Sequence, residues 1–82
     1  QNVKDADKQS IVVQITNRDR IRIRGRDIDF RAVRANIERL HAENPDAPVV
    51  VQPHPDSTTE TMIHVMDSAR QAGVYSVSIA AT

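Results

Sequence analysis

The amino-acid sequence predicts an α+β fold: a two-layer α/β sandwich in the order β-β-α-β-α-β, with one small sheet and two helices on one face. Of two short stretches near the start, the first is rich in β-branched residues and the second alternates apolar and polar residues, and both patterns are typical of strands. Two longer stretches carry apolar residues three and four positions apart, as amphipathic helices do. The first helical stretch is followed by a β-branched run and the second by a stretch that alternates larger apolar with small residues, so helices and strands alternate in the second half.

The first part of the chain predicts a β-hairpin. Residues 10–16 (SIVVQIT) are rich in β-branched residues, and residues 20–24 (RIRIR) alternate strictly between arginine and isoleucine. Residues 17–19 (NRD) supply turn-forming side chains between the two strands. We expect Ile21 and Ile23 to face the core, and residues 25–28 to connect the hairpin to the first helix.

The first helix is predicted from an apolar stripe and two end signals. Asp29, or alternatively Asp27, is suited to the N-cap, where a carboxylate accepts hydrogen bonds from free backbone N–H groups. Asn44-Pro45 ends the helix, because proline disfavours helical geometry in the residue before it. The stripe covers three turns and consists of Phe30, Val33, Ile37 and Leu40.

The third strand is predicted after Pro48, at the unbroken β-branched run of residues 49–51 (VVV). Such a run is typical of a central or parallel strand that is covered on both faces, which indicates a βαβ crossover. Residues 52–56 (QPHPD) are expected to form a stiff loop, since Pro53 and Pro55 restrict its backbone.

The second helix and the last strand follow this loop. A capping-box pattern would place the Ser57 hydroxyl at the N-cap and Glu60 three residues later. Gly73 fits the left-handed position that ends many helices. The stripe of this helix consists of Met62, Val65, Met66 and Ala69. The apolar face of the last strand consists of Tyr75, Val77, Ile79 and Ala81.

Length and composition restrict the function. Eighty-two residues allow one small domain, which we place at residues 10–82, and the polar residues 1–9 are expected to form a flexible lead-in. The chain contains no cysteine, which excludes disulfides and thiolate metal sites. Aromatic residues make up 2% of the chain, too few for a platform that stacks nucleic-acid bases. Because the chain begins with Gln1, we expect a processed chain or an excised domain.

The formal net charge is zero, but the charges are unevenly distributed. Residues 18–39 contain eight arginines against four acidic residues, whereas residues 40–82 contain one arginine against five. Arg20, Arg22 and Arg24 are expected to project from one face of the second strand as an arginine ladder. This ladder is open to three interpretations: a solvated face that discourages aggregation, a surface for an anionic protein or glycan, and a nucleic-acid contact. The first is favoured, and three features argue against a nucleic-acid contact: the overall pI of about 7.0, the lack of stacking residues and the interspersed acidic residues.

No residue pattern indicates a metal site or a bound cofactor, and we expect neither. His41, His54 and His64 lack the short spacing of metal-binding pairs, and no HExxH motif occurs. With only Gly25 and Gly73, the chain has no glycine-rich loop to hold phosphates.

Catalysis is not expected either. Asp27 and Asp29 adjoin a predicted helix N-terminus, where negative charge is stabilising without any catalytic role. Ser57 has a capping role, and no histidine is placed to activate it. We therefore expect that the chain is not an enzyme.

Three stretches together resemble the ExbD/TolR family. They are residues 44–51 (NPDAPVVV), 60–74 (ETMIHVMDSARQAGV) and 77–79 (VSI). The family has a hydrophobic strand after Asn-Pro, a helix containing Val-Met-Asp, an Ala-Gly-Val break and a final strand. The hairpin of the family, with its I-x-I pattern and a following glycine, corresponds here to Ile21, Ile23 and Gly25. The resemblance covers residues 10–82 and is most specific from Val65 to Val74.

The resemblance implies a periplasmic domain of an inner-membrane motor driven by the proton-motive force. Members dimerise, work with an ExbB-like or TolQ-like channel subunit, and pass force to a TonB-like or TolA-like protein. An ExbD-like subunit is favoured, which would serve TonB-dependent uptake of iron chelates and other nutrients. The alternative is a TolR-like subunit of the Tol-Pal envelope system. Some members of the family bind peptidoglycan. The single transmembrane helix of the family, with its proton-carrying aspartate, lies outside this chain. A stand-alone nucleic-acid or regulatory domain that uses the arginine ladder is the rival interpretation.

One departure from the family pattern follows the third strand. Where the family commonly has Ala-Asp, this chain has Pro53-His54. Any role of the family aspartate therefore has no counterpart at this position.

The last strand is the predicted partner-binding site. A small sheet leaves an edge strand with unpaired backbone groups, onto which an extended segment can add as a further strand. Val77 and Ile79 would anchor this strand to the core while its serine face stays open. The assigned residues are Ser76, Val77, Ser78, Ile79 and Ala80. In the whole protein, residues 1–9 would form a tether that could cover the edge until a partner displaces it.

Overall fold

The structure is a computed structural model, and it describes residues 10–80. The predicted lead-in at residues 1–9, and Ala81 of the predicted last strand, lie outside the described residues. The elements in chain order are β1 (Ile11–Ile15), β2 (Ile21–Ile23), β3 (Arg26–Ile28), the 3₁₀ helix η1 (Phe30–Ala32), α2 (Val33–Glu43), β4 (Val49–Pro53), α3 (Thr59–Gln71) and β5 (Val77–Ile79).

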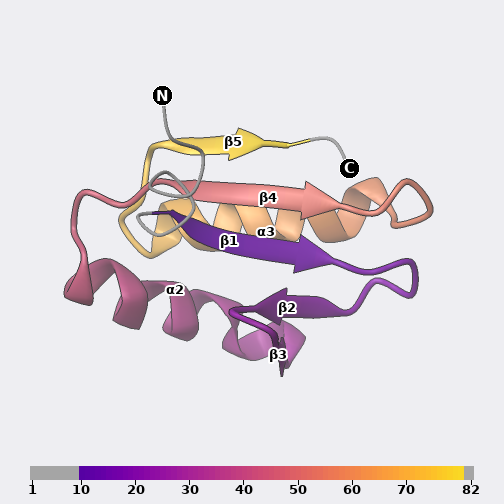
Figure 1. The fold of residues 1–82 in the computed structure, drawn as a ribbon, viewed down its shortest axis with the longest axis horizontal. Coiled ribbons are helices and arrows are strands. Elements are labelled where there is room, and N and C mark those ends of the chain that lie inside the picture. The colour runs from indigo at the N-terminus through magenta and orange to yellow at the C-terminus, as the bar shows by residue number, and fades with distance from the viewer. Residues whose placement is uncertain (1–9, 81–82) are drawn as a thin grey trace.

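The strands form one mixed sheet in the order β3-β2-β1-β4-β5 (Figure 1). The β1–β2 and β2–β3 pairs are antiparallel, whereas β4 is parallel to both β1 and β5. Helices α2 and α3 pack against each other on one face of this sheet. The predicted α+β sandwich is confirmed. Strand β4 is flanked by β1 and β5 and parallel to both, as its β-branched run indicates, but α2 and α3 cover the same face of the sheet, so within residues 10–80 the run is not covered by helices on both faces.

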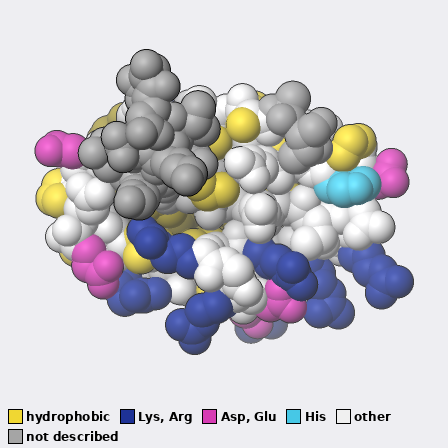
Figure 2. Space-filling model, in the orientation of Figure 1, with side chains coloured by type: hydrophobic (Ala, Val, Ile, Leu, Met, Phe, Trp, Pro, Cys, Tyr) yellow, Lys and Arg dark blue, Asp and Glu magenta, His cyan; other side chains and the backbone are white. Residues whose placement is uncertain are grey.

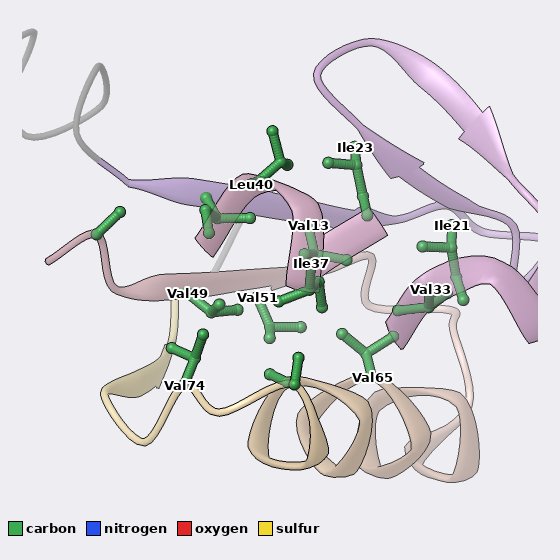
Figure 3. Close-up of a cluster of buried hydrophobic side chains, with 14 of the residues drawn as sticks. Val13, Ile21, Ile23, Val33, Ile37, Leu40, Val49, Val51, Val65 and Val74 are labelled. Atoms are coloured by element: carbon green, nitrogen blue, oxygen red, sulfur yellow. The ribbon is translucent and has the colours of Figure 1, made fainter. Parts of the chain in front are cut away.

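The core lies between the two helices and the sheet face that they cover (Figure 3). Alternate residues of each strand point to this face, because successive side chains of a strand point to opposite sides. The buried side chains include Val13, Ile21, Ile23, Val33, Ile37, Leu40, Val49, Val51, Val65 and Val74. The inward orientation predicted for Ile21 and Ile23 is therefore confirmed.

The stretch predicted as a connector, residues 25–28, contains the additional strand β3. Arg24 and Gly25 have φ angles of +54° and +78°. Two consecutive residues in the left-handed region form the tight turn that suits the twist of a two-residue hairpin. The chain therefore reverses at once, and Arg26–Ile28 pairs with β2. Strand β2 is also shorter than predicted, because Arg20 and Arg24 lie just outside it.

The first helical segment begins differently from the prediction. Asp29 is the cap, as expected, and its carboxylate accepts a hydrogen bond of 2.8 Å from the N–H of Arg31. Phe30, however, lies in η1 and is 46% exposed rather than part of the buried stripe. A 3₁₀ turn winds three residues per turn, so Phe30 is out of line with the apolar stripe of α2. Its ring stacks on His64 of α3, with ring centroids 3.7 Å apart.

The second helix is capped one residue later than predicted. Thr58 is the N-cap of α3, and its hydroxyl accepts a hydrogen bond of 3.3 Å from the N–H of Thr61. The Ser57 hydroxyl donates instead to the carbonyl of His54 at 2.7 Å, so it is not available to the helix. Gly73 ends the helix as expected, with a φ of +97°. The N–H of Gly73 donates to the Arg70 carbonyl, and the N–H of Val74 donates to the Ala69 carbonyl. These two hydrogen bonds form the Schellman motif.

Two strand boundaries also differ from the prediction. Gln52 and Pro53, assigned to a loop, belong to β4 and pair with Gln14 and Ile15 of β1. Tyr75, assigned to the apolar face of the last strand, precedes β5 and is 82% exposed. None of the helices within residues 10–80 has the length and apolar character needed to cross a membrane.

Candidate functional site

Strand β5 forms one edge of the sheet, and its outer backbone groups have no partner among residues 10–80 (Figure 1). On the inner side, the N–H of Val49 donates to the Ser76 carbonyl, and the N–H of Ala80 donates to the Val51 carbonyl, both at 2.9 Å. Backbone groups of successive strand residues point to opposite sides. The N–H and C=O groups of Val77 and Ile79 therefore point away from β4. They can accept a further strand.

The side chains of the predicted site divide between the two faces of the sheet. Val77 pairs with Val49, and Ile79 pairs with Val51, so both point to the face that carries the helices. Val77 is half-buried against the core, but Ile79 is 50% exposed. Ile79 is therefore a weaker anchor than expected, because it lies at the edge of the sheet. Of the remaining assigned residues, Ser76 and Ser78 are exposed and Ala80 is half-buried.

A groove of about 340 Å³ borders the exposed side of Ile79. Three segments form it: the end of β5, the proline-containing loop after β4, and the first turn of α3. Ile79, Met62, Pro53 and Pro55 supply apolar surface, and the lining also includes the polar residues Ser57, Thr58 and Thr59. A side chain of a strand added to β5 would lie next to this groove.

Hydrogen bonds hold the loop that forms one wall of the groove. The N–H of His54 donates to the Ile15 carbonyl at 2.9 Å, which continues the pairing of β4 with β1. The Nδ1 atom of His54 accepts a hydrogen bond of 3.0 Å from the N–H of Asp56. The Asp19 carboxylate accepts a hydrogen bond of 2.7 Å from the N–H of Thr58. These bonds fix the loop, so the groove is already formed in the free chain.

The arginine ladder is partly neutralised. Arg22 and Asp27 face each other on β2 and β3, and the Arg22 Nε lies 2.8 Å from the Asp27 carboxylate. Arg20 lies 3.9 Å from the same carboxylate. Arg24 lies in the β2–β3 turn and has no ion pair with any of the described residues. Figure 2 shows basic side chains gathered along the part of the molecule that carries β2 and β3, interspersed with acidic ones.

The residues considered for metal binding and catalysis come from separate elements of the structure. His41 is in the last turn of α2, His54 is in the loop after β4, and His64 is on α3. The Nε2 of His64 donates to the Phe30 carbonyl at 3.0 Å, since a carbonyl can only accept. Asp29 caps η1. Residues 10–80 contain no group of three or more His, Cys, Asp or Glu residues that could hold a metal ion.

Sequence reasoning missed the groove, because its residues come from separate segments. The spacing of Pro53 and Pro55 was a usable signal, since two prolines stiffen a loop and expose apolar surface. Met62, assigned to the core stripe of its helix, does pack against the core; it is half-buried and also lines the groove.

The fold defines a class of protein: a small mixed α/β domain whose last strand lies parallel to its neighbour at one edge of the sheet, with no further strand beside it among residues 10–80. The comparison with known proteins agrees with the family resemblance. The whole chain, residues 1–82, matches the family model described as biopolymer transport protein ExbD/TolR. The protein belongs to the ExbD/TolR family.

A curated relative is the biopolymer transport protein exbD2 of Vibrio cholerae serotype O1, which is 39% identical to this chain over 71 residues. The aligned region covers 87% of this chain and 53% of the relative. The chain thus spans about half the length of the relative that it matches. The similarity also agrees with the prediction of an ExbD-like sequence.

Proposed function

We propose that this chain is the globular domain of an ExbD-like subunit of a transport motor driven by the proton-motive force. The subunit sits in the bacterial inner membrane with this domain in the periplasm. It acts as a homodimer with an ExbB-like channel, and it transmits force to a TonB-like protein for the uptake of iron chelates and other nutrients. Membership of the ExbD/TolR family and the name of the Vibrio relative support this assignment.

The domain contributes binding rather than chemistry. A disordered partner segment adds to β5 as a further strand, parallel or antiparallel, and its backbone bonds the outer groups of Val77 and Ile79. The single observation that carries this proposal is the open edge of β5 beside a preformed apolar groove. Main-chain hydrogen bonds give such a complex its affinity, and the groove selects an apolar side chain of the partner.

A titration tests the proposal. The isotope-labelled chain is mixed with synthetic peptides from the periplasmic linkers of a TonB-like and a TolA-like protein, and amide chemical shifts are recorded. We expect saturable shifts confined to β5 and the groove, with the TonB-type peptide preferred. Preference for the TolA-type peptide would assign the chain to the TolR-like branch instead. Absence of shifts with both peptides would contradict binding at this edge.

Matched variants separate the contribution of the β5 backbone to peptide binding from that of its side chains. Ile79→Pro removes an N–H that points outward, a substitution that edge strands tolerate, and it should abolish peptide binding in a folded domain. Ser78→Ala leaves the outer backbone intact, because Ser78 directs its backbone groups toward β4, and it should bind normally. Ile79→Gln removes apolar surface at the groove and should weaken binding while the fold is retained. Binding and dimerisation that are unchanged by Ile79→Gln and Ile79→Pro would make the proposal wrong.

A further inference from the structure

A small basic hollow lies at the opposite edge of the sheet, between the β2–β3 turn and α2. Its volume is about 190 Å³. Arg24, Arg26 and Arg39 line it, together with Asn36 and Glu43. Apolar lining comes from Ile23 and Leu40, which are buried, and from the half-buried Ile28. The hollow therefore combines positive charge with an apolar surface.

The positive charge of this hollow is incompletely balanced. Arg24 and Arg26 have no acidic partner among the described residues, whereas Arg20 and Arg22 share Asp27. Arg39 lies 3.8 Å from Glu43 and donates a hydrogen bond of 3.3 Å to the Asn36 side chain. Both contacts are exposed, so they are weak and can rearrange when a stronger acceptor enters. Three arginines thus face one carboxylate.

Arg24 occupies an unfavourable backbone position. Its φ of +54° lies in the left-handed region, where asparagine, aspartate and glycine are preferred in this type of turn. An arginine at this place weakens the turn relative to asparagine, yet it brings a guanidinium to the hollow. The hairpin turn itself requires the positive φ, so the noteworthy feature is the choice of an arginine, next to an incompletely balanced basic cluster, at a position that suits asparagine or aspartate better.

We propose that the basic hollow binds an acidic side chain, glutamate or aspartate, of an extended polypeptide. An arginine guanidinium group can form bidentate hydrogen bonds with a carboxylate. The apolar surface of the hollow accommodates the methylene groups of the glutamate or aspartate side chain. The hollow is smaller than the 300–1,000 Å³ or so of ordinary small-molecule pockets, so it holds one side chain rather than a nucleotide or a substituted sugar. Strand β3 borders the hollow and is itself an edge strand, along which an extended segment can lie. The inference does not depend on the site at β5.

The test is a chemical-shift titration of the isotope-labelled chain with a blocked tetraglutamate peptide, compared with a tetraglutamine peptide and with inorganic phosphate. We expect the glutamate peptide to shift the amides of residues 24–28 and 36–43, with an effect that weakens as salt is added. The tetraglutamine peptide should produce no such shifts. Phosphate at the same concentration should produce much smaller ones.

Two variants and one control make the assignment specific. Arg24→Asn should weaken binding about two- to five-fold, the range that an exposed ion pair supports, while it stabilises the turn. Arg26→Gln should weaken binding by a similar factor. Arg70→Gln, an exposed arginine at the end of α3, should leave binding unchanged. The proposal would be overturned if both hollow variants bound the glutamate peptide as well as the unmodified chain, or if the shifts lay outside the hollow. Equal binding of tetraglutamine or of phosphate would also overturn it.

Discussion

The carboxylate of Asp19 accepts a hydrogen bond of 2.7 Å from the backbone N–H of Thr58, across 39 positions of sequence. This bond joins the β1–β2 turn to the start of α3. Asp19 itself has a φ of +59°, a conformation that aspartate and asparagine tolerate better than most residues. Because Thr58 and its neighbours line the groove beside β5, the contact links the stability of the fold to the shape of the candidate site.

Substitution of Asp19 should therefore destabilise the domain. Asp19→Ala removes the acceptor and a residue suited to the left-handed region, and it should lower the free energy of unfolding by about 1–2 kcal/mol. Asp19→Asn keeps an acceptor oxygen and the backbone preference, so its effect should be about half as large. Urea denaturation measures the free energy of unfolding of both variants. Equal losses in the two variants would mean that the negative charge near the helix N-terminus, rather than the hydrogen bond, is the stabilising feature.

The position of the helix cap gives a second prediction. Thr58→Ala removes the side chain that caps α3 and should lower the free energy of unfolding by about 1 kcal/mol. Ser57→Ala removes only a hydrogen bond within the preceding loop, and about 0.5 kcal/mol is expected. The comparison is made by urea denaturation followed by circular dichroism. A larger loss of unfolding free energy for Ser57→Ala than for Thr58→Ala would mean that Ser57 is the N-cap, as the sequence predicts.

Core packing gives the third prediction. Ile37 is fully buried between α2 and the sheet, and Ile37→Ala should cost about 2–5 kcal/mol, a large part of the stability of a domain of this size. Ile63 is the matched control, since its side chain is 57% exposed on α3. Ile63→Ala should change the free energy of unfolding by less than about 0.5 kcal/mol. Comparable losses in the two variants, measured by denaturation, would contradict the observed orientation of the helices.

The sequence predicts the elements that have a regular apolar pattern. The alternation of Ile21 and Ile23, the β-branched run that begins at Val49, and the stripe of α2 from Val33 onward each identify an element and its buried face. Strand β3 has no such pattern, because Arg26 and Asp27 are charged. It forms because the turn at Arg24 and Gly25 folds it against β2, where Asp27 meets Arg22.

The candidate site is predictable only in part. The alternation of Val77 and Ile79 indicates a strand with one inward face, and the size of the sheet implies that some strand is left at an edge. The groove beside Ile79 depends on tertiary contacts such as the bond between Asp19 and Thr58, which no local pattern predicts. Phe30 is a similar case, since its contact with His64 depends on the packing of η1 on α3.

Hydrogen exchange of three neighbouring amides in β5 tests the central claim most directly. In the free chain, the N–H groups of Val77 and Ile79 point outward and should exchange quickly, whereas that of Ser78 faces β4 and should be protected. Addition of the TonB-type peptide should slow exchange at Val77 and Ile79 and leave Ser78 nearly unchanged. If the peptide binds and the outward amides keep their fast exchange, partner segments do not add to β5, and the function proposed for this edge is wrong.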